Sequence, residues 1–123
     1  MTESRRKILV VDDQPTLARA IKRMLVEHDV TTLGSAREAL ETIEAGIRYD
    51  VILSDLMMPE LSGMDLHEAV AKIDPQQVTR MVFMTGGAFT GRAREFVERS
   101  GTPTIEKPFD KAALLSLLDS YLR

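Results

Sequence analysis

The sequence KILVV at Lys7–Val11, followed directly by two aspartates, decides the fold class of this chain. Apolar residues at successive positions are typical of a strand that is buried on both faces, as in a parallel sheet covered by helices. Two further apolar runs and two weaker ones follow, at Asp50–Ser54, Arg80–Met84, Val30–Leu33 and Thr104–Ile105. The chain is therefore predicted to contain five strands of a parallel sheet.

Amphipathic stretches with the period of an α-helix separate these strands. The first helix is predicted from about Pro15 to Glu27. Four later stretches place apolar residues on one helical face: Ala36, Ala39, Leu40 and Ile43; Leu66, Ala69, Val70 and Ile73; Phe89, Ala93, Phe96 and Val97; and Leu114, Leu115, Leu118 and Leu122. Ser35 with Glu38 predicts a capping box, Asp110 an N-cap and Gly46 a helix end.

The predicted strands and helices alternate five times along the chain. This (βα)5 alternation predicts an α/β fold with a doubly wound, five-stranded parallel sheet, right-handed crossovers and helices on both faces. Pro103 predicts that the last strand lies at a sheet edge, because a proline removes a ladder hydrogen bond. Residues 1–123 are expected to form a single domain, with residues 1–6 as an N-terminal tail and residues 7–122 as the folded core.

Composition argues against several function classes. The 123 residues carry a formal net charge of −3 with scattered basic side chains, which disfavours nucleic-acid binding by bulk electrostatics. The absence of cysteine excludes disulfides, zinc thiolate sites and thiol catalysis. The apolar runs are too short to span a bilayer, and Met1–Lys7 leads into no signal-peptide core. We expect a cytoplasmic protein that binds neither nucleic acid nor membrane directly.

Polar residues gather where the predicted strands end. Ligands of an open α/β sheet bind outside the carboxyl ends of its strands. The residues in those places are Asp12 and Asp13, Asp55, Thr85 with Gly86 and Gly87, and Lys107 with Pro108. Carboxylates about 4 Å apart repel by about 4 kcal/mol per pair at an effective dielectric constant of about 20. A hard divalent cation such as Mg²⁺ would relieve this repulsion, since it prefers oxygen ligands and needs only one or two carboxylates from the protein.

Asp55 is the best candidate for a nucleophile among these residues. It stands alone at the end of a central strand, whereas Asp12 and Asp13 are adjacent and better suited to hold a metal ion. Carboxylates act as phosphoryl acceptors through an aspartyl phosphate. Thr85 would donate its hydroxyl hydrogen to a phosphoryl oxygen, and Gly86 would leave the approach to that oxygen open.

Each of these residues also has an ordinary structural explanation. An aspartate pair before a helix is more often a cap than a metal site, and Asp55 before a Pro-Gly turn is commonly a turn residue. Lys107 alone would be a solvated surface lysine. The combination favours a functional site, because five such coincidences would have to fall on one edge of the sheet. His28 and His67 are interpreted as surface residues.

The same residues resemble the motif set of response-regulator receiver domains of two-component signalling. The matching segments are Val10–Asp13, Asp55–Pro59 with Gly63, Thr85–Gly86 and Lys107–Phe109. The resemblance covers nearly the whole chain and agrees in both order and spacing. It implies the flavodoxin-like strand order 2-1-3-4-5 and a phosphoacceptor function in a phosphorelay.

The resemblance also implies roles for the acidic residues and for Met57. Asp55 would accept the phosphoryl group. Asp13, Asp55 and the backbone carbonyl of Met57 would bind Mg²⁺ directly. Asp12 would act largely through water, and Mn²⁺ is expected to substitute for Mg²⁺.

Further implied roles concern the phosphoryl group and its donor. Thr85, Lys107 and the backbone of Gly86 would bind the phosphoryl group, and the Lys107–Pro108 peptide bond would be cis. The donor would be a phosphohistidine on a histidine kinase or a histidine phosphotransfer domain, which would dock partly on the helix that begins near Pro15. The chain would catalyse its own aspartyl phosphorylation and dephosphorylation without a kinase core, and a phosphorylation-dependent dimer is a further expectation.

One position of the motif set departs from the family pattern. Many receivers carry an aromatic residue three positions before the lysine, which moves inward together with the hydroxyl residue. Thr104 occupies that position here, so the aromatic half of the Thr85–Thr104 switch is missing. The segment Phe83–Phe89, with Glu106, resembles receivers that are fused to hybrid histidine kinases.

Met57 and Gly87 predict slow hydrolysis of the aspartyl phosphate. In this family the residues two positions after the phosphoacceptor and after the hydroxyl residue tune hydrolysis, and neither side chain here can bind the attacking water. Introducing Met57→Asn together with Gly87→Glu is expected to speed the loss of the phosphoryl group, measured as the decay of the phosphorylated mass. An unchanged decay rate would contradict this explanation.

Two alternative functions remain open at the level of sequence. An unphosphorylated receiver fold could act as an interaction scaffold, an interpretation that Thr104 favours. An aspartate-nucleophile phosphatase would also use Mg²⁺ and a lysine, but it needs a general acid beside the nucleophile, and position 57 is methionine. Partner binding that ignores phosphorylation would favour the first, and turnover of a phosphate ester would favour the second.

Overall fold

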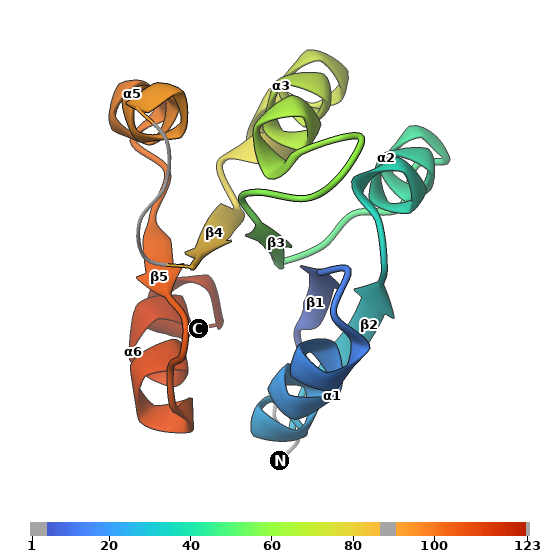
Figure 1. Ribbon diagram of the computed structural model, residues 1–123. Helices are drawn as coiled ribbons and strands as arrows, with labels where there is room; N and C mark the ends of the chain where they lie inside the picture. The colour runs from blue at the N-terminus through green and yellow to red at the C-terminus, as the bar shows by residue number, and fades with distance from the viewer. Residues whose placement is uncertain (1–4, 87–90, 123) are drawn as a thin grey trace.

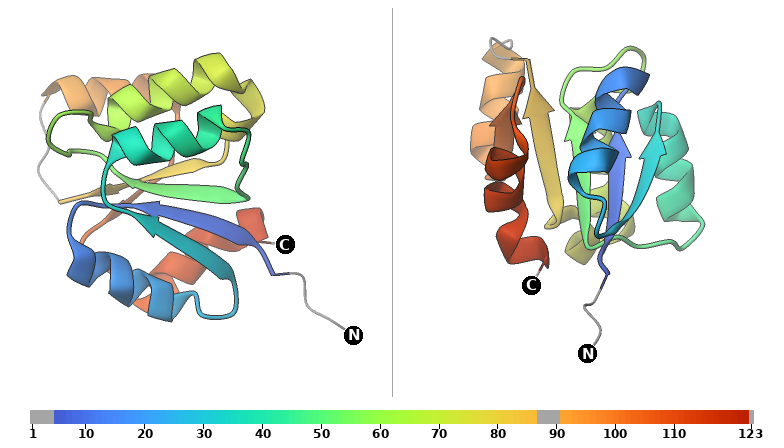
Figure 2. Two further views of the ribbon diagram at one scale, coloured as in Figure 1. Left: turned by 90° about the vertical axis from the view of Figure 1, so that its right-hand side faces the viewer. Right: turned by 90° about the horizontal axis from the view of Figure 1, so that it is seen from below.

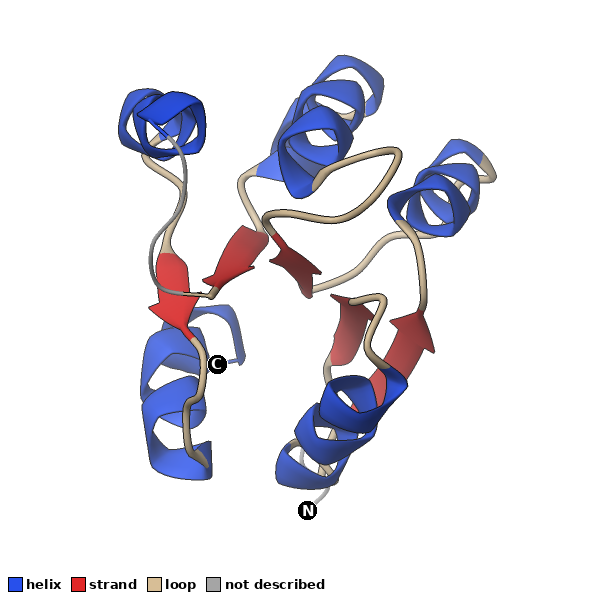
Figure 3. Ribbon diagram, viewed as in Figure 1, coloured by secondary structure: helices blue, strands red, loops and turns tan. Residues whose placement is uncertain are grey.

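The computed structural model describes residues 5–86 and 91–122. In this part of the chain five strands form one parallel sheet (Figure 3). They are β1 (Lys7–Val11), β2 (Asp29–Leu33), β3 (Val51–Asp55), β4 (Met81–Thr85) and β5 (Thr104–Glu106). Their order is β2-β1-β3-β4-β5, and every neighbouring pair is parallel. The predicted α/β class and strand order are therefore confirmed.

Helices cover both faces of this sheet. The described helices are α1 (Pro15–Met24), α2 (Ala36–Glu44), α3 (Gly63–Ile73), α4 (Pro75–Val78), α5 (Gly91–Ser100) and α6 (Lys111–Leu122). Helices α2, α3 and α5 lie on one face, and α1 and α6 lie on the other (Figures 1 and 2). The sheet is thus the middle layer of three. None of the described helices is both long and apolar enough to cross a membrane.

Successive residues of each central strand pack alternately into two hydrophobic cores, one on each face of the sheet. Leu9, Ile52 and Phe83 belong to the core under α2, α3 and α5. Val10 and Leu53 belong to the core under α1 and α6. Successive side chains of a strand point to opposite faces, so a strand that is covered on both sides must be apolar at consecutive positions. This explains the continuous apolar runs of the sequence.

The predicted helix caps are present with one difference. The Ser35 hydroxyl accepts a hydrogen bond from the Glu38 N–H, and Asp110 accepts one from the Ala113 N–H. The Glu38 carboxylate, however, accepts from the N–H of Gly34 rather than from that of Ser35, so the capping box is not closed as predicted. After α2, Gly46 has a φ of +100°, a conformation that suits glycine at a helix end.

Three local predictions were wrong. Helix α1 ends at Met24 rather than near Glu27, because β2 must begin at Asp29 to pair with Lys7 and a turn has to precede it. The short helix α4 was missed, although an aspartate followed by Pro75 is a helix-start signal. Ile73, at the end of α3, is 38% exposed rather than buried. Phe89 lies outside the described residues.

Strand β5 lies at the edge of the sheet, as Pro103 predicts. Pro103 directly precedes this strand, and its carbonyl accepts a hydrogen bond from the Phe83 N–H of β4 at 2.9 Å. The Pro103 carbonyl therefore serves β4, the strand next to β5. The missing N–H of the proline is not needed, because no strand of the described chain pairs with the other side of β5.

Candidate functional site

The strand register brings the polar residues of the sequence to one edge of the sheet. Val11 pairs with Ser54, so Asp12 lies beside Asp55 at the ends of β1 and β3. Asp55 pairs with Met84, which places Thr85 one position further along β4. Because all pairs are parallel, every strand presents its carboxyl end to the same edge.

Asp12, Asp13 and Asp55 form an acidic cluster at this edge. One carboxylate oxygen of each lies within 4.8 Å of those of the other two. Asp12 and Asp55 are buried, whereas Asp13 is exposed. Neither Asp12 nor Asp13 is the N-cap of α1, since that position is Gln14. The ordinary cap interpretation of the aspartate pair is therefore wrong, although Asp12 accepts a hydrogen bond from the Gln14 N–H.

Lys107 joins this cluster from the carboxyl end of the edge strand β5. Its Nζ lies 3.2 Å from an oxygen of Asp12 and 3.3 Å from an oxygen of Asp55. The Lys107 N–H donates to the Thr85 carbonyl at 2.7 Å, and the Lys107–Pro108 peptide bond is cis. The side chain of Lys107 is only 18% exposed, so it is not a solvated surface lysine.

The charges of the cluster do not balance within the protein. The three carboxylates and one ammonium carry a net charge of −2 when all are ionised. Burial raises the pKa of the Asp55 carboxyl above its ordinary value; the Lys107 ammonium opposes this rise, and the Asp12 carboxylate adds to it. The donor set consists of carboxylate oxygens, which are the ligands that hard divalent cations prefer. These residues fit Mg²⁺.

The structure also describes Thr85, Gly86, Met57 and Thr104. Thr85 is buried at the end of β4, and a Cβ atom added to Gly86 would meet nothing within 4 Å, so the space above that backbone is open. The Met57 N–H donates to a carboxylate oxygen of Asp55 at 3.4 Å, while its side chain is 47% exposed. Thr104 is exposed on the edge strand. Gly87 lies outside the described residues.

Gly63 has a positioning role that the sequence did not predict, although it belongs to the motif set. It is the first residue of α3, and its N–H donates to the Leu56 carbonyl at 3.0 Å. A Cβ atom at this position would overlap the backbone oxygen of Asp55 and would press against Leu56. Only a residue without a side chain lets α3 begin against the backbone of Asp55.

Comparison with known protein families gives a match over most of the chain. A family model described as response regulator receiver domain matches residues 8–119. The two-component response regulator ARR11 of Arabidopsis thaliana is 32% identical over 121 residues, which cover 95% of this chain and 22% of that protein. The transcriptional regulatory protein BtsR of Escherichia coli K12 is 33% identical over 111 residues, which cover 88% of this chain and 44% of that protein. The chain thus spans less than half the length of these relatives.

Solved structures share the fold over nearly the full length of both chains. The chemotaxis protein CheY4 of Vibrio cholerae has a TM-score of 0.82 at 27% identity, covering 97% of this chain and 100% of its own. The receiver domain of the sensor histidine kinase PA1611 of Pseudomonas aeruginosa has a TM-score of 0.81 at 27% identity, covering 97% and 98% of the two chains. The latter structure contains a magnesium ion coordinated in its active-site cleft.

Proposed function

Since this chain belongs to the response regulator receiver domain family of two-component signalling, we propose that it accepts a phosphoryl group from a phosphohistidine on Asp55. One observation carries the proposal. The buried Asp55 carboxylate lies 3.3 Å from the Lys107 ammonium and shares a cluster with the carboxylates of Asp12 and Asp13. This is the arrangement of charges that a phosphoryl group and a divalent cation would complete.

The metal of this proposal is Mg²⁺. Asp12, Asp13 and Asp55 would hold it, together with the backbone carbonyl of Met57, and the uncompensated charge of the acidic cluster supports this assignment. When bound, the ion would neutralise negative charge on the transferring group. Asp13 is the exposed member of the cluster and is therefore the one that a hydrated ion would meet first.

The chain's own residues would carry the transfer. A carboxylate oxygen of Asp55 forms a bond to phosphorus while the P–N bond of the phosphohistidine breaks, and its electron pair stays with the imidazole nitrogen. Asp55 must be ionised to attack, and the Lys107 ammonium favours that form against the effect of burial. The Lys107 ammonium and the Thr85 hydroxyl would then bind oxygens of the phosphoryl group.

The partner of this reaction would be a histidine kinase or a histidine phosphotransfer domain. The output of the protein, including a phosphorylation-dependent dimer, would follow from the aspartyl phosphate. The exposed Thr104 supports a second candidate, in which the chain is an interaction scaffold whose surface does not respond to phosphorylation. Partner binding with and without the phosphoryl group would separate these two functions.

The proposal is tested by the intact mass of the protein after incubation with acetyl phosphate, with and without Mg²⁺. We expect the wild type to gain the mass of one phosphoryl group only when Mg²⁺ is present, and Asp55→Asn to gain none. Asp29→Asn, which changes an exposed aspartate at the start of β2, is the matched control and should behave as the wild type.

Two results would contradict the proposal. A gain of mass in Asp55→Asn would place the phosphoryl group elsewhere. The absence of any gain in the wild type, together with no binding of the phosphoryl mimic beryllofluoride, would favour the unphosphorylated scaffold.

A further inference from the structure

His67 is half-buried rather than fully exposed, so its interpretation as a surface residue is only partly right. It belongs to α3 and is half-buried beneath α5. The centroid of its ring lies 5.7 Å from that of Phe83 on β4 and 5.2 Å from that of Phe96 on α5, with the Phe96 ring nearly perpendicular. The imidazole therefore connects three elements of the core.

His67 also makes a polar contact with the turn that follows α5. Its Nε2 lies 3.1 Å from the Thr102 hydroxyl oxygen, which in turn lies 2.8 Å from the hydroxyl oxygen of Ser100 at the end of α5. Thr102 is buried, and both of these contacts are partly buried. His67 thus contacts α5 through the Phe96 ring and through the turn that follows the helix.

Phe96 is the largest buried side chain of helix α5. Among the described residues of this helix only Ala93 and Phe96 are buried, and the partly buried Val97 packs against the same core. The Phe96 ring packs on both His67 and Phe83. Figure 1 shows α5 beside α3 at the end of its layer. In the chain α5 connects β4, which ends at Thr85, to β5, which ends directly before Lys107.

We propose that neutral His67 anchors α5 against α3 and β4, and that protonation of its imidazole weakens this anchor. A charged imidazole in this place loses hydration and stands beside two apolar rings. The Arg99 guanidinium already lies over the Phe96 ring, 5.6 Å from its centroid. A second cation at the same ring would be repelled by the first.

The surroundings of His67 offer little compensation for a positive charge. Burial lowers the pKa of His67 below its ordinary value, and the Glu68 carboxylate opposes this only in part. Among the described residues that line the surface hollows around the imidazole, the other ionisable groups are Lys72 on α3, Arg99 on α5 and Tyr121 on α6, and none of these is an anion at neutral pH. The one described residue of β4 that lines these hollows is the apolar Met81.

Room exists for the anchor to open. His67 lines two open hollows of the surface, one between α3 and α5 and one next to Thr102. A charged ring could therefore turn toward water, and it would then leave Phe96 and Thr102. Helix α5 connects β4, which ends at Thr85, to β5, which ends directly before Lys107. A movement of α5 would therefore displace the ends of these two strands at the candidate site.

The sign of the pH dependence follows from the lowered pKa. The unfolded chain binds a proton on His67 at a higher pH than the folded protein does, so the stability from neutral His67 is present above the ordinary pKa of about 6.5 and is lost as the pH falls below it. Asp55 contributes a pH dependence of the opposite sign, because its raised pKa makes the folded protein bind a proton more readily than the unfolded chain, which increases stability as the pH falls. The test therefore uses the Asp55→Asn background.

The experiment compares urea unfolding of Asp55→Asn at about pH 7.5 and at about pH 5.5. We expect the urea concentration at the unfolding midpoint to be lower at about pH 5.5 than at about pH 7.5. Adding His67→Gln, which keeps a hydrogen-bonding side chain but cannot be protonated, should remove more than about half of that decrease. Adding His28→Gln instead, as the matched control, should leave the decrease in place. Equal decreases with and without His67→Gln would overturn the proposal.

A direct readout keeps the proposal testable if His67→Gln does not fold. In a proton NMR titration of the Asp55→Asn protein, with the His67 signal assigned against His28→Gln, we expect His67 to titrate below the ordinary histidine value. Hydrogen exchange should show protection in α5 falling more than in α6 as His67 becomes protonated. Titration at or above the ordinary value, or equal losses of protection in the two helices, would refute the anchor.

Discussion

Replacing Gly63 with alanine is expected to lower the free energy of unfolding by about 3 kcal/mol, because a methyl group inserted into a fully packed place forces the backbone to move. The added Cβ would overlap the backbone oxygen of Asp55. Either α3 must shift at its first residue, or the end of β3 must shift with the carboxylate that it carries. The prediction is measured by urea denaturation of Gly63→Ala.

The same substitution is expected to impair phosphorylation more than its loss of stability explains. The first residue of α3 lies against the backbone of Asp55, so the strain falls on the proposed phosphoacceptor. The rate of mass gain from acetyl phosphate should decrease at a temperature at which Gly63→Ala is still folded.

Gly34→Ala is the matched control for this prediction. An added Cβ at Gly34 meets nothing closer than the Glu38 carboxylate at 4.0 Å. Its stability should therefore change by no more than about 0.5 kcal/mol. If Gly63→Ala proves as stable as Gly34→Ala, the loop between β3 and α3 can adjust, and the close approach of α3 to Asp55 does not constrain the site.

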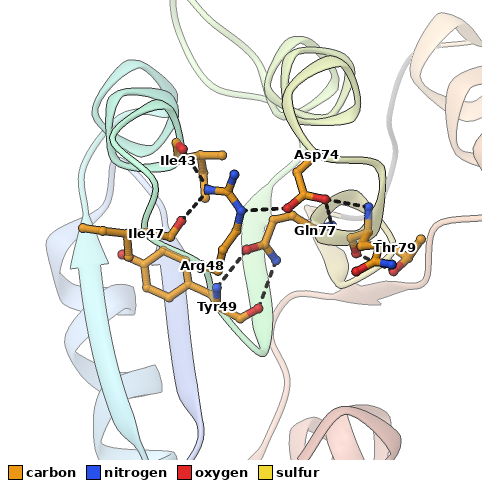
Figure 4. Close-up of polar contacts among 8 residues, drawn as sticks. Ile43, Ile47, Arg48, Tyr49, Asp74, Gln77 and Thr79 are labelled. Atoms are coloured by element: carbon orange, nitrogen blue, oxygen red, sulfur yellow. Dashed lines mark hydrogen bonds and ion pairs between the residues drawn. The ribbon is translucent and has the colours of Figure 1, made fainter.

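Replacing Gln77 with leucine is expected to lower the free energy of unfolding by about 3 kcal/mol, because two buried backbone groups would lose their partners. Gln77 lies on α4 and is only 3% exposed. Its side-chain oxygen accepts from the Tyr49 N–H at 2.8 Å, and its amide nitrogen donates to the Tyr49 carbonyl at 3.0 Å (Figure 4). Leucine has a similar volume but can form neither bond. Urea denaturation measures the loss.

The neighbouring Gln76 provides the control for Gln77. Its side chain is exposed on the same short helix, so Gln76→Ala should change the stability by less than about 0.5 kcal/mol. A comparable loss in both variants would mean that α4 itself, rather than the bridge to Tyr49, is what the substitutions disturb. The salt bridge between Arg48 and Asp74 lies beside this bridge, and neither substitution removes an atom of it (Figure 4).

The sequence by itself determined the architecture and the composition of the candidate site. Continuous apolar runs such as Ile8–Val11 are typical of strands that are covered on both faces, and their alternation with helical stretches allows few arrangements other than a parallel sheet between two helix layers. Parallel strands bring their carboxyl ends to one edge. The positions of Asp12, Asp55 and Lys107 at the carboxyl ends of the first, third and fifth strands were therefore enough to predict that these residues meet.

Only the tertiary structure decided how residues from different elements constrain one another. That Gly63 must lack a side chain follows from the distance between α3 and β3. The bridge from Gln77 to Tyr49 and the burial of His67 between Phe83 and Phe96 depend on how neighbouring elements pack. Sequence periodicity reports the face on which a residue lies but not the partner that it meets there, because the partner is fixed by the packing of elements that are distant in the chain.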